Sequence, residues 1–223
     1  MVNSGMETTI RILDTAILAG DKYNLRKVVF ERANKQGQPV IQTRFVFDRG
    51  NGAAILLYNR LAGTVILTRQ FRLPAWLAAN ATGTVDASGT GDATGAGHAP
   101  EAGDATGMLV EVCAGELDQD APETAVRREA EEETGFRLDD VVKVFESYMS
   151  PGAATEIIHF FIAEYSPAMK VAKGGGLEAE QEEIEVLELP FTDALQMVKS
   201  GEIRDAKTIM LLLYARGEIF PYI

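Results

Sequence analysis

A predicted helix with a dense block of acidic residues constrains this chain more than any other feature. Residues 114–136 read AGELDQDAPETAVRREAEEETGF. Asp120 occupies a favourable N-cap position and Pro122 fits the first helical turn. The helix is expected to end near Thr134, because Gly135 suits a C-terminal cap. The segment therefore predicts a tight turn followed by a capped, glutamate-rich helix.

The spacing of three of these glutamates indicates a metal site. Glu129 and Glu133 lie four residues apart and share one helix face, with Glu132 beside them. Carboxylates so close repel one another unless a cation lies among them. Hard divalent ions bind carboxylate oxygens, so Mg²⁺ is expected, with Mn²⁺ as the alternative. Because Arg128 and Glu132 form an i,i+4 pair, a solvated helix face fits the spacing equally well.

The order of residues in the second half of the segment favours the metal site. Residues 128–136, REAEEETGF, resemble the second half of the Nudix box, R-E-U-x-E-E-x-G-U, with every fixed position filled. The chain thus resembles the Nudix family. Counting back from Arg128, the upstream Gly and Glu of the box fall on Ala114 and Asp120, while the natural glycine is Gly115. The turn is one residue shorter than the common box, which affects its geometry more than the metal site.

Composition and charge exclude several classes of protein. The 223-residue chain has a formal net charge of −12, which disfavours nucleic acid or an anionic membrane as its partner. Its longest apolar run, residues 209–213, is too short to span a bilayer. A lone Cys113 excludes an intrachain disulfide, and the N-terminus does not resemble a secretion signal. A cytoplasmic protein is expected.

Alternating apolar and turn-forming residues predict the order of elements. Strands are expected at residues 8–19, 24–32, 40–47, 53–58, 64–68, 108–113, 141–149, 156–165 and 184–189, and closing helices at residues 192–200 and 205–216. A mixed sheet between helical layers follows, which is an α/β class. The Nudix resemblance implies an α/β/α sandwich, to which the sequence adds an N-terminal β-hairpin region.

Two domains and one insertion are expected. Residues 1–48 form an N-terminal β-rich dimerisation region, and residues 49–223 form the Nudix hydrolase domain. Residues 78–107 consist mostly of Ala, Gly, Thr and Asp. Such a segment cannot offset its ordering entropy by burial, so a flexible insertion is predicted.

The resemblance assigns catalytic roles to acidic residues. Nudix-like enzymes hydrolyse a nucleoside diphosphate linked to another group, using divalent ions to neutralise the diphosphate and activate water. Glu129 and Glu133 are the expected first metal ligands and catalytic groups, with Glu132 as a third ligand or its neighbour. The backbone carbonyl of Ala114 is a further ligand that the resemblance implies.

A second group of carboxylates is expected from outside the box. Residues 178–183, EAEQEE, form an acidic loop that composition alone describes as solvated. Related diphosphatases use a glutamate of the equivalent loop as ligand or base, so the resemblance favours Glu182, with Glu183 as the alternative. Glu156, after a Pro-Gly turn, is a second candidate for general base or substrate contact.

Segments outside the box resemble the GDP-mannose pyrophosphatase branch of the family. They are residues 47–53, 69–72, 148–152, 158–165 and 201–205. The branch implies a homodimer that cuts a nucleotide sugar, GDP-mannose, into GMP and mannose 1-phosphate. ADP-ribose pyrophosphatases share the RQFR stretch, so ADP-ribose or another ADP-sugar is the nearest alternative substrate. A silent nucleotide-binding regulator is a third hypothesis, which the intact glutamates oppose.

The branch also implies substrate contacts at Tyr23, Arg44, Arg72, Glu156 and Lys207. Arg72 and Lys207 suit phosphates. Arg44 can fork onto a phosphate or a base edge, and Tyr23 can stack on the base. For the cations the alternative is simple solvation, and for Tyr23 it is packing.

Overall fold

The computed structural model describes residues 9–80, 105–177, 179 and 181–222. Its backbone forms two compact units. The first contains the described residues up to Gly52 and also Glu146–Ile158, and the second contains Ala53–Phe145 and the residues from His159 onward. Most of the predicted insertion, residues 81–104, lies outside the described residues. None of the described helices is long and apolar enough to cross a membrane.

The first unit is built on an antiparallel sheet of three strands in the order β1-β2-β3. Its strands are β1 (Arg11–Gly20), β2 (Asn24–Ala33) and β3 (Pro39–Asp48). The side chain of Asn34 accepts hydrogen bonds from the backbone N–H groups of Gln36 and Gln38, both at 2.9 Å, and thereby closes the β2–β3 turn. The predicted hairpin region is confirmed.

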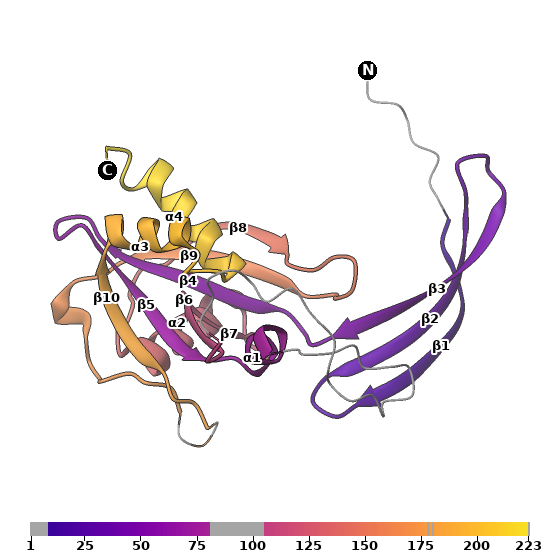
Figure 1. Ribbon diagram of the computed structural model, residues 1–223, viewed down its shortest axis with the longest axis horizontal. Helices are drawn as coiled ribbons and strands as arrows, with labels where there is room; N and C mark the ends of the chain where they lie inside the picture. The colour runs from indigo at the N-terminus through magenta and orange to yellow at the C-terminus, as the bar shows by residue number, and fades with distance from the viewer. Residues whose placement is uncertain (1–8, 81–104, 178, 180, 223) are drawn as a thin grey trace. The chain divides into compact units, whose positions relative to one another are not determined.

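The second unit contains the larger sheet, in the order β10-β5-β4-β9-β8, with β6 paired to β5 and β7 to β4. The strand bounds are β4 (Gly52–Asn59), β5 (Thr64–Phe71), β6 (Met108–Glu111), β7 (Cys113–Glu116), β8 (Val142–Tyr148), β9 (Ile157–Glu164) and β10 (Glu185–Pro190). β5 runs antiparallel to β10, β4 and β6. Figure 1 shows β4 and β5 beside each other at the centre of this unit.

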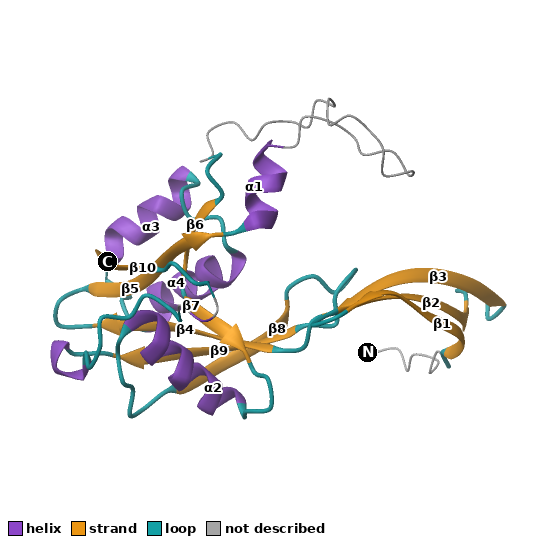
Figure 2. Cartoon of the chain, turned by 90° about the horizontal axis from the view of Figure 1, so that it is seen from below, coloured by secondary structure: helices purple, strands orange, loops and turns teal. Residues whose placement is uncertain are grey.

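Helices cover both faces of the larger sheet (Figures 1 and 2). On one face, Ile55 and Leu57 of β4 pack in one buried cluster with Val126 of α2 (Pro122–Glu129). On the other face, Tyr58 contacts Phe220, which follows α4 (Ala206–Glu218) and stacks on Phe191 of α3 (Phe191–Ser200) at 4.4 Å between ring centroids. Burial on both sides explains the continuous apolarity of β4. The α/β class and the sandwich are confirmed.

One helix was not predicted. Helix α1 (Leu73–Asn80) follows β5 directly and buries none of its residues. Trp76 and Leu77 both remain partly exposed on it. Because its apolar residues follow no helical period, the sequence carries no amphipathic signal for this element.

The predicted strand 108–113 is wrong in detail. It is split into β6 and β7, because the N–H of Val112 donates to the side chain of Thr208 at 2.8 Å. The break leaves Ala114 and Gly115 inside β7, so the tight turn predicted at these residues is also wrong. The turn falls later, where the N–H of Asp120 donates to the carbonyl of Leu117 at 2.8 Å.

Two helix ends in this unit share one backbone conformation and differ in their surroundings. Gly135 and Gly201 cap helices in the left-handed region, at φ 79° and 81°. A Cβ atom on Gly135 would lie 2.2 Å from the carbonyl oxygen of Ala172, whereas one on Gly201 meets nothing within 4 Å. Gly135 therefore serves both a left-handed turn and a close backbone contact.

This difference predicts unequal costs for the same substitution. Gly201→Ala should lower the free energy of unfolding by about 1–2 kcal/mol, the cost of a left-handed conformation for a residue with a side chain. Gly135→Ala should lower it by more, because the backbone at Ala172 must also move. Urea unfolding of the two variants measures both values. Equal losses would show that the contact with Ala172 does not restrict residue 135.

Candidate active site

The acidic helix begins and ends differently from its prediction. Its N-cap is Ala121, which makes no side-chain cap hydrogen bond, so the predicted N-cap at Asp120 is wrong by one residue. The carboxylate of Asp120 instead lies 3.7 Å from the guanidinium of Arg128. After Glu129 the chain widens into a π-helical turn, η1 (Ala130–Thr134). The predicted end near Thr134 and the cap at Gly135 are confirmed.

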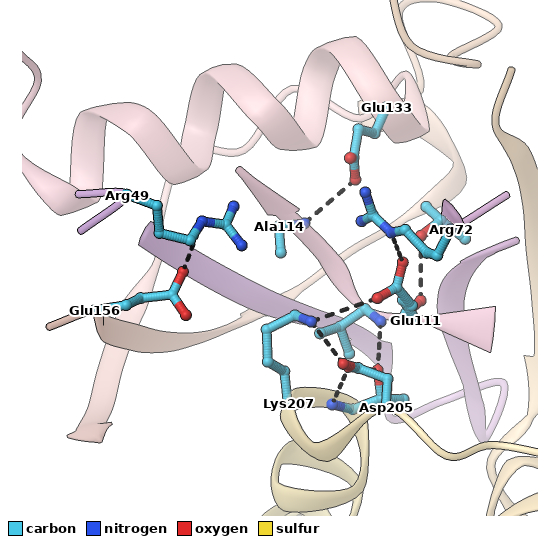
Figure 3. Close-up of polar contacts among 11 residues, drawn as sticks. Arg49, Arg72, Glu111, Ala114, Glu133, Glu156, Asp205 and Lys207 are labelled. Carbon is cyan, nitrogen blue, oxygen red and sulfur yellow. Dashed lines mark hydrogen bonds and ion pairs between the residues drawn. The ribbon is translucent and has the colours of Figure 1, made fainter. Parts of the chain in front are cut away.

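The π-helical turn carries Glu133 into the interior. This residue is 2% exposed, and its Oε2 accepts a hydrogen bond of 3.3 Å from the N–H of Ala114 (Figure 3). Burial, together with the negative charges of Glu129 and Glu182, raises the pKa of Glu133 to about 8, and the hydrogen bond with Cys113 opposes this shift. Three predicted metal ligands are therefore close enough to repel one another.

Glu129 occupies space that a side chain on Gly115 would fill. A Cβ atom on Gly115 would lie 2.1 Å from the carboxyl carbon of Glu129. One carboxylate oxygen of Glu129 is 2.9 Å from the guanidinium of Arg128. The glycine in strand β7 is thus required so that the Glu129 carboxylate can lie against the backbone.

Glu132 has a cationic partner of its own. Its Oε2 accepts a hydrogen bond of 3.2 Å from Nη1 of Arg128. The same guanidinium lies near the carboxylates of Glu129 and Asp118, and these charges raise its pKa against the opposing effect of burial. Glu129 and Glu132 both engage Arg128 in this structure, and as metal ligands both stay predictions.

The glycine-rich segment 174–176, just before the acidic loop 178–183, is fixed to the end of the π-helical turn. The N–H groups of Gly175 and Gly176 donate to the carbonyls of Glu133 and Glu132, at 2.8 and 3.2 Å. Oε2 of Glu182 in the acidic loop accepts a hydrogen bond of 3.1 Å from the N–H of Leu177, the residue just before this loop. Of the predicted loop 178–183, Glu178 and Glu180 lie outside the described residues.

A cavity of about 990 Å³ opens beside this loop. Glu182 and Glu183 line it together with three cations, Arg69, Lys170 and Lys173. Both glutamates that the sequence suggests as the loop base therefore border the same cavity, and Glu183 stays the alternative to Glu182.

The donor set fits a divalent cation by its chemistry. In the part of the chain that the structure describes, no three ligating side chains converge tightly on one point. Glu182 is turned toward Leu177, and Glu129 lies near Arg128. Even so, Glu133 is a buried carboxyl whose ionisation two further carboxylates oppose. A cation among these oxygens would remove that repulsion, so Glu129, Glu133 and Glu182 are the residues that would hold it.

Besides the first polar cluster, formed by Glu129, Glu133 and Glu182, a second polar cluster contains both predicted phosphate contacts. It consists of Arg72, Glu111, Asp205 and Lys207. Arg72 donates through Nε to Glu111 at 2.7 Å, and Lys207 lies 3.4 Å from the other oxygen of Glu111 and 2.6 Å from Asp205 (Figure 3). Sequence analysis missed Glu111 and Asp205. A charged residue inside the apolar run 108–113 is the signal that could have identified Glu111.

The other predicted substrate residues belong to the first unit. Glu156 is 3.3 Å from Nε of Arg49, and this guanidinium lies over the ring of Tyr23 at 5.6 Å. Tyr23 also makes an edge contact with Phe47 at 5.8 Å. Arg49 was missed as a site residue, because its segment, residues 47–53, was interpreted only as part of the resemblance. Glu156 and Tyr23 are thus connected through one arginine.

Arg44 lies in the first unit but outside the group that Arg49 connects. It lies on β3 opposite Val28 and hydrogen-bonds locally to the carbonyl of Thr43 at 2.8 Å and the side chain of Gln42 at 3.1 Å. Its substrate role stays a prediction.

Comparison with known proteins identifies relatives of this chain. A NUDIX domain model matches residues 97–212. A GDP-mannose pyrophosphatase of Salmonella typhimurium is 46% identical over 209 residues, which cover 94% of this chain and 96% of that protein. Another, from Yersinia pestis, is 46% identical over 216 residues, 97% of this chain and 96% of that protein.

A solved structure supports the fold. The crystal structure of an ADP compounds hydrolase superposes with a TM-score of 0.65 at 15% identity, over 98% of both chains. The matched domain model and the near-full-length relatives agree with the REAEEETGF signature of residues 128–136. The chain belongs to the NUDIX family of hydrolases.

Proposed function

We propose that the protein is a Mg²⁺-dependent nucleotide-sugar diphosphatase that hydrolyses GDP-mannose to GMP and mannose 1-phosphate. The buried Glu133, with Glu129 and Glu182 close enough to raise its pKa, carries the proposal of a metal-dependent hydrolase. Similarity to GDP-mannose pyrophosphatases along nearly the whole chain supports the choice of substrate. The lone cysteine, the buried Cys113, fits action in the cytoplasm.

Members of the family generally require a divalent metal. Glu129, Glu133 and Glu182 would hold it in this chain, with the carbonyl of Ala114 and the carboxylate of Glu132 as further candidates. When bound, the ion supplies charge neutralisation for the diphosphate and a lowered pKa for water. Mn²⁺ is the alternative ion, since it accepts the same oxygen ligands.

The remaining chemistry falls to side chains of the chain itself. The oxygen of water attacks one phosphorus, the bridging P–O bond breaks, and the bridging oxygen leaves with the other phosphate. Glu182 takes the proton of the attacking water, with Glu183 and Glu156 as the alternative bases. Arg72 and Lys207 hold the phosphate oxygens. These groups lower the barrier mainly by position and charge, because phosphoryl transfer needs little covalent help from the protein.

Base recognition is assigned to the first unit. Tyr23 offers a ring face for the base, and its contact with Arg49 favours a fixed orientation of that ring. Arg44 donates to a phosphate or a base edge, and Glu156 accepts from the substrate if it does not serve as the base. For Tyr23 and Glu156 the assignment rests on position in the sequence and on the shared contact with Arg49. For Arg44 it rests on position in the sequence alone.

Measuring the products tests the substrate directly. Incubation with Mg²⁺ and, separately, GDP-mannose, ADP-ribose and other sugar nucleotides should give the fastest turnover with GDP-mannose, with GMP and mannose 1-phosphate in equal amounts. Faster turnover of ADP-ribose would change the assignment to an ADP-sugar diphosphatase. No hydrolysis of any of these compounds would remove the enzyme hypothesis and favour a nucleotide-binding regulator.

Removing one carboxylate should separate catalysis from folding. Glu133→Gln should lower kcat/KM by at least about 100-fold, because even the outer-shell partners of a metal contribute about 10–100-fold. The variant should not lose thermal stability without metal at pH 7, since burial already keeps this carboxyl mostly uncharged and an amide oxygen can still accept from the N–H of Ala114. Mg²⁺ should raise the melting temperature of the natural protein and not that of the variant.

A matched control lies two residues earlier in the same turn. Glu131→Gln removes an exposed carboxylate that pairs with Arg137 at 2.7 Å. It should leave both kcat/KM and the response to Mg²⁺ unchanged. Full activity in Glu133→Gln, or an equal loss in Glu131→Gln, would remove Glu133 from the metal site.

We also propose that the protein is a homodimer formed through the first unit. Strand β1 is exposed along its whole length, and Ile12 and Ile17 on it are 58% and 67% exposed. Ile41 and Phe45 add exposed apolar surface on β3. An apolar surface of this kind is typical of an interface.

Replacing two of these residues should abolish the dimer. Light scattering should give twice the mass of one chain for the natural protein and the mass of one chain for the double variant Ile12→Asp, Ile17→Asp. The control is Leu61→Asp, at a turn residue that is 99% exposed, and it should remain dimeric. A monomeric natural protein would exclude the proposed interface.

A further inference from the structure

The second polar cluster is connected by hydrogen bonds from the surface to the core. The Glu111 carboxylate is only 4% exposed and lies between Nε of Arg72 at 2.7 Å and Nζ of Lys207 at 3.4 Å. Lys207 continues to Asp205 at 2.6 Å, and Asp205 accepts from both the N–H and the hydroxyl of Thr208, at 2.9 and 2.7 Å. The end of strand β6 and the start of helix α4 are joined by these contacts.

Both cations keep donors that this cluster does not use. Arg72 donates to Glu111 only through Nε, and its side chain is 40% exposed. Among the described residues Glu111 is its one side-chain partner, so the four N–H groups of its fork remain available. Lys207 uses two of its three ammonium donors, on Glu111 and Asp205. Each cation can therefore bind a phosphate oxygen while Glu111 still holds it.

We propose that Glu111 is a positioning residue that fixes Arg72 and Lys207 for the diphosphate of the substrate. The inference rests on the proposed function, because it takes these two cations as the phosphate contacts. Arg72 is the more exposed of the two, and an arginine without a fixed Nε samples many orientations. The buried carboxylate removes that freedom before the substrate arrives, so the entropy of ordering Arg72 is not lost on binding.

Charge is essential to this role. A neutral amide at position 111 can still accept from Nε of Arg72, but its NH₂ group then points at the ammonium of Lys207, where it has no acceptor to offer. It also leaves two cations without the negative charge that lies between them. Glu111→Gln is therefore nearly isosteric and still expected to loosen the orientation of both cations, although Asp205 continues to hold Lys207 at 2.6 Å.

A double-substitution cycle tests the coupling between Glu111 and Arg72. The natural protein, Glu111→Gln, Arg72→Ala and the double variant are compared in two measurements. The first is kcat/KM with the best sugar nucleotide. The second is the Kd, in the presence of Mg²⁺, for imidodiphosphate, a diphosphate analogue whose P–N–P bridge resists hydrolysis. Glu111→Gln should weaken both about 10-fold, the value of one charge-assisted hydrogen bond. In the Arg72→Ala background the same change should have at most about a 2-fold effect, because only Lys207 remains there to orient and Asp205 also holds it, at 2.6 Å.

A carboxylate in a part-buried pair supplies the control. Glu188 accepts from the hydroxyl of Tyr165 at 2.6 Å, away from both polar clusters. Glu188→Gln should change stability without changing the Kd for imidodiphosphate. If Glu111→Gln does not fold, Arg72→Lys replaces it: charge is kept, the Nε–H is lost, and imidodiphosphate should again bind about 10-fold more weakly.

The two readouts distinguish the failure of each proposal. Hydrolysis of GDP-mannose with equal effects of Glu111→Gln in both backgrounds would overturn the positioning role and leave the function intact. No hydrolysis of any sugar nucleotide, with the imidodiphosphate coupling present, would overturn the function and leave the positioning role intact. Natural affinity for imidodiphosphate in Glu111→Gln or Arg72→Lys would overturn the positioning role in either case.

Discussion

The candidate site depends on backbone hydrogen bonds between residues 171–176, which lead into the acidic loop, and the end of the glutamate-rich helix. A helix end leaves carbonyl groups without partners inside the helix. Here the N–H groups of Gly175 and Gly176 donate hydrogen bonds to the carbonyls of Glu133 and Glu132. The N–H of Val171 donates to the carbonyl of Gly135. Carbonyls that water would otherwise solvate instead hold a second segment of chain in place. The carboxylate of Glu182 consequently acts on Glu133 although 48 intervening residues form other parts of the fold.

Local patterns predicted the elements, and long-range contacts decided where prediction failed. The apolar run of β4 and the glycine after η1 each carry a signal that depends only on neighbouring residues. The break between β6 and β7 depends on Thr208, nearly a hundred residues away, so no local pattern reveals it. The glutamates of the box were identified through their fixed order, whereas Glu111 follows no motif that spacing could expose. Its importance arises only where Arg72 and Lys207 meet around it.

Electrostatics in this protein work at short range. A net charge of −12 repels an anionic substrate at a distance, and salt weakens that repulsion. Within the Arg72 cluster two cations face two carboxylates, so the cluster has little net charge of its own. The proposed recognition of a diphosphate therefore relies on directed N–H groups and on a metal ion among the glutamates, which would act only when the ligand is nearly in place.

Two hydrogen bonds join the chain segments on either side of residues 81–104. The side chain of Asn80 donates to the carbonyl of Ala105 at 2.9 Å, and the N–H of Arg72 donates to that of Gly107 at 2.8 Å. A chain segment whose ends are already joined changes the closure entropy by only about 0.6 kcal/mol when its length doubles. The second unit thus has a natural graft point, where a reporter domain with adjacent termini can be accommodated at small thermodynamic cost.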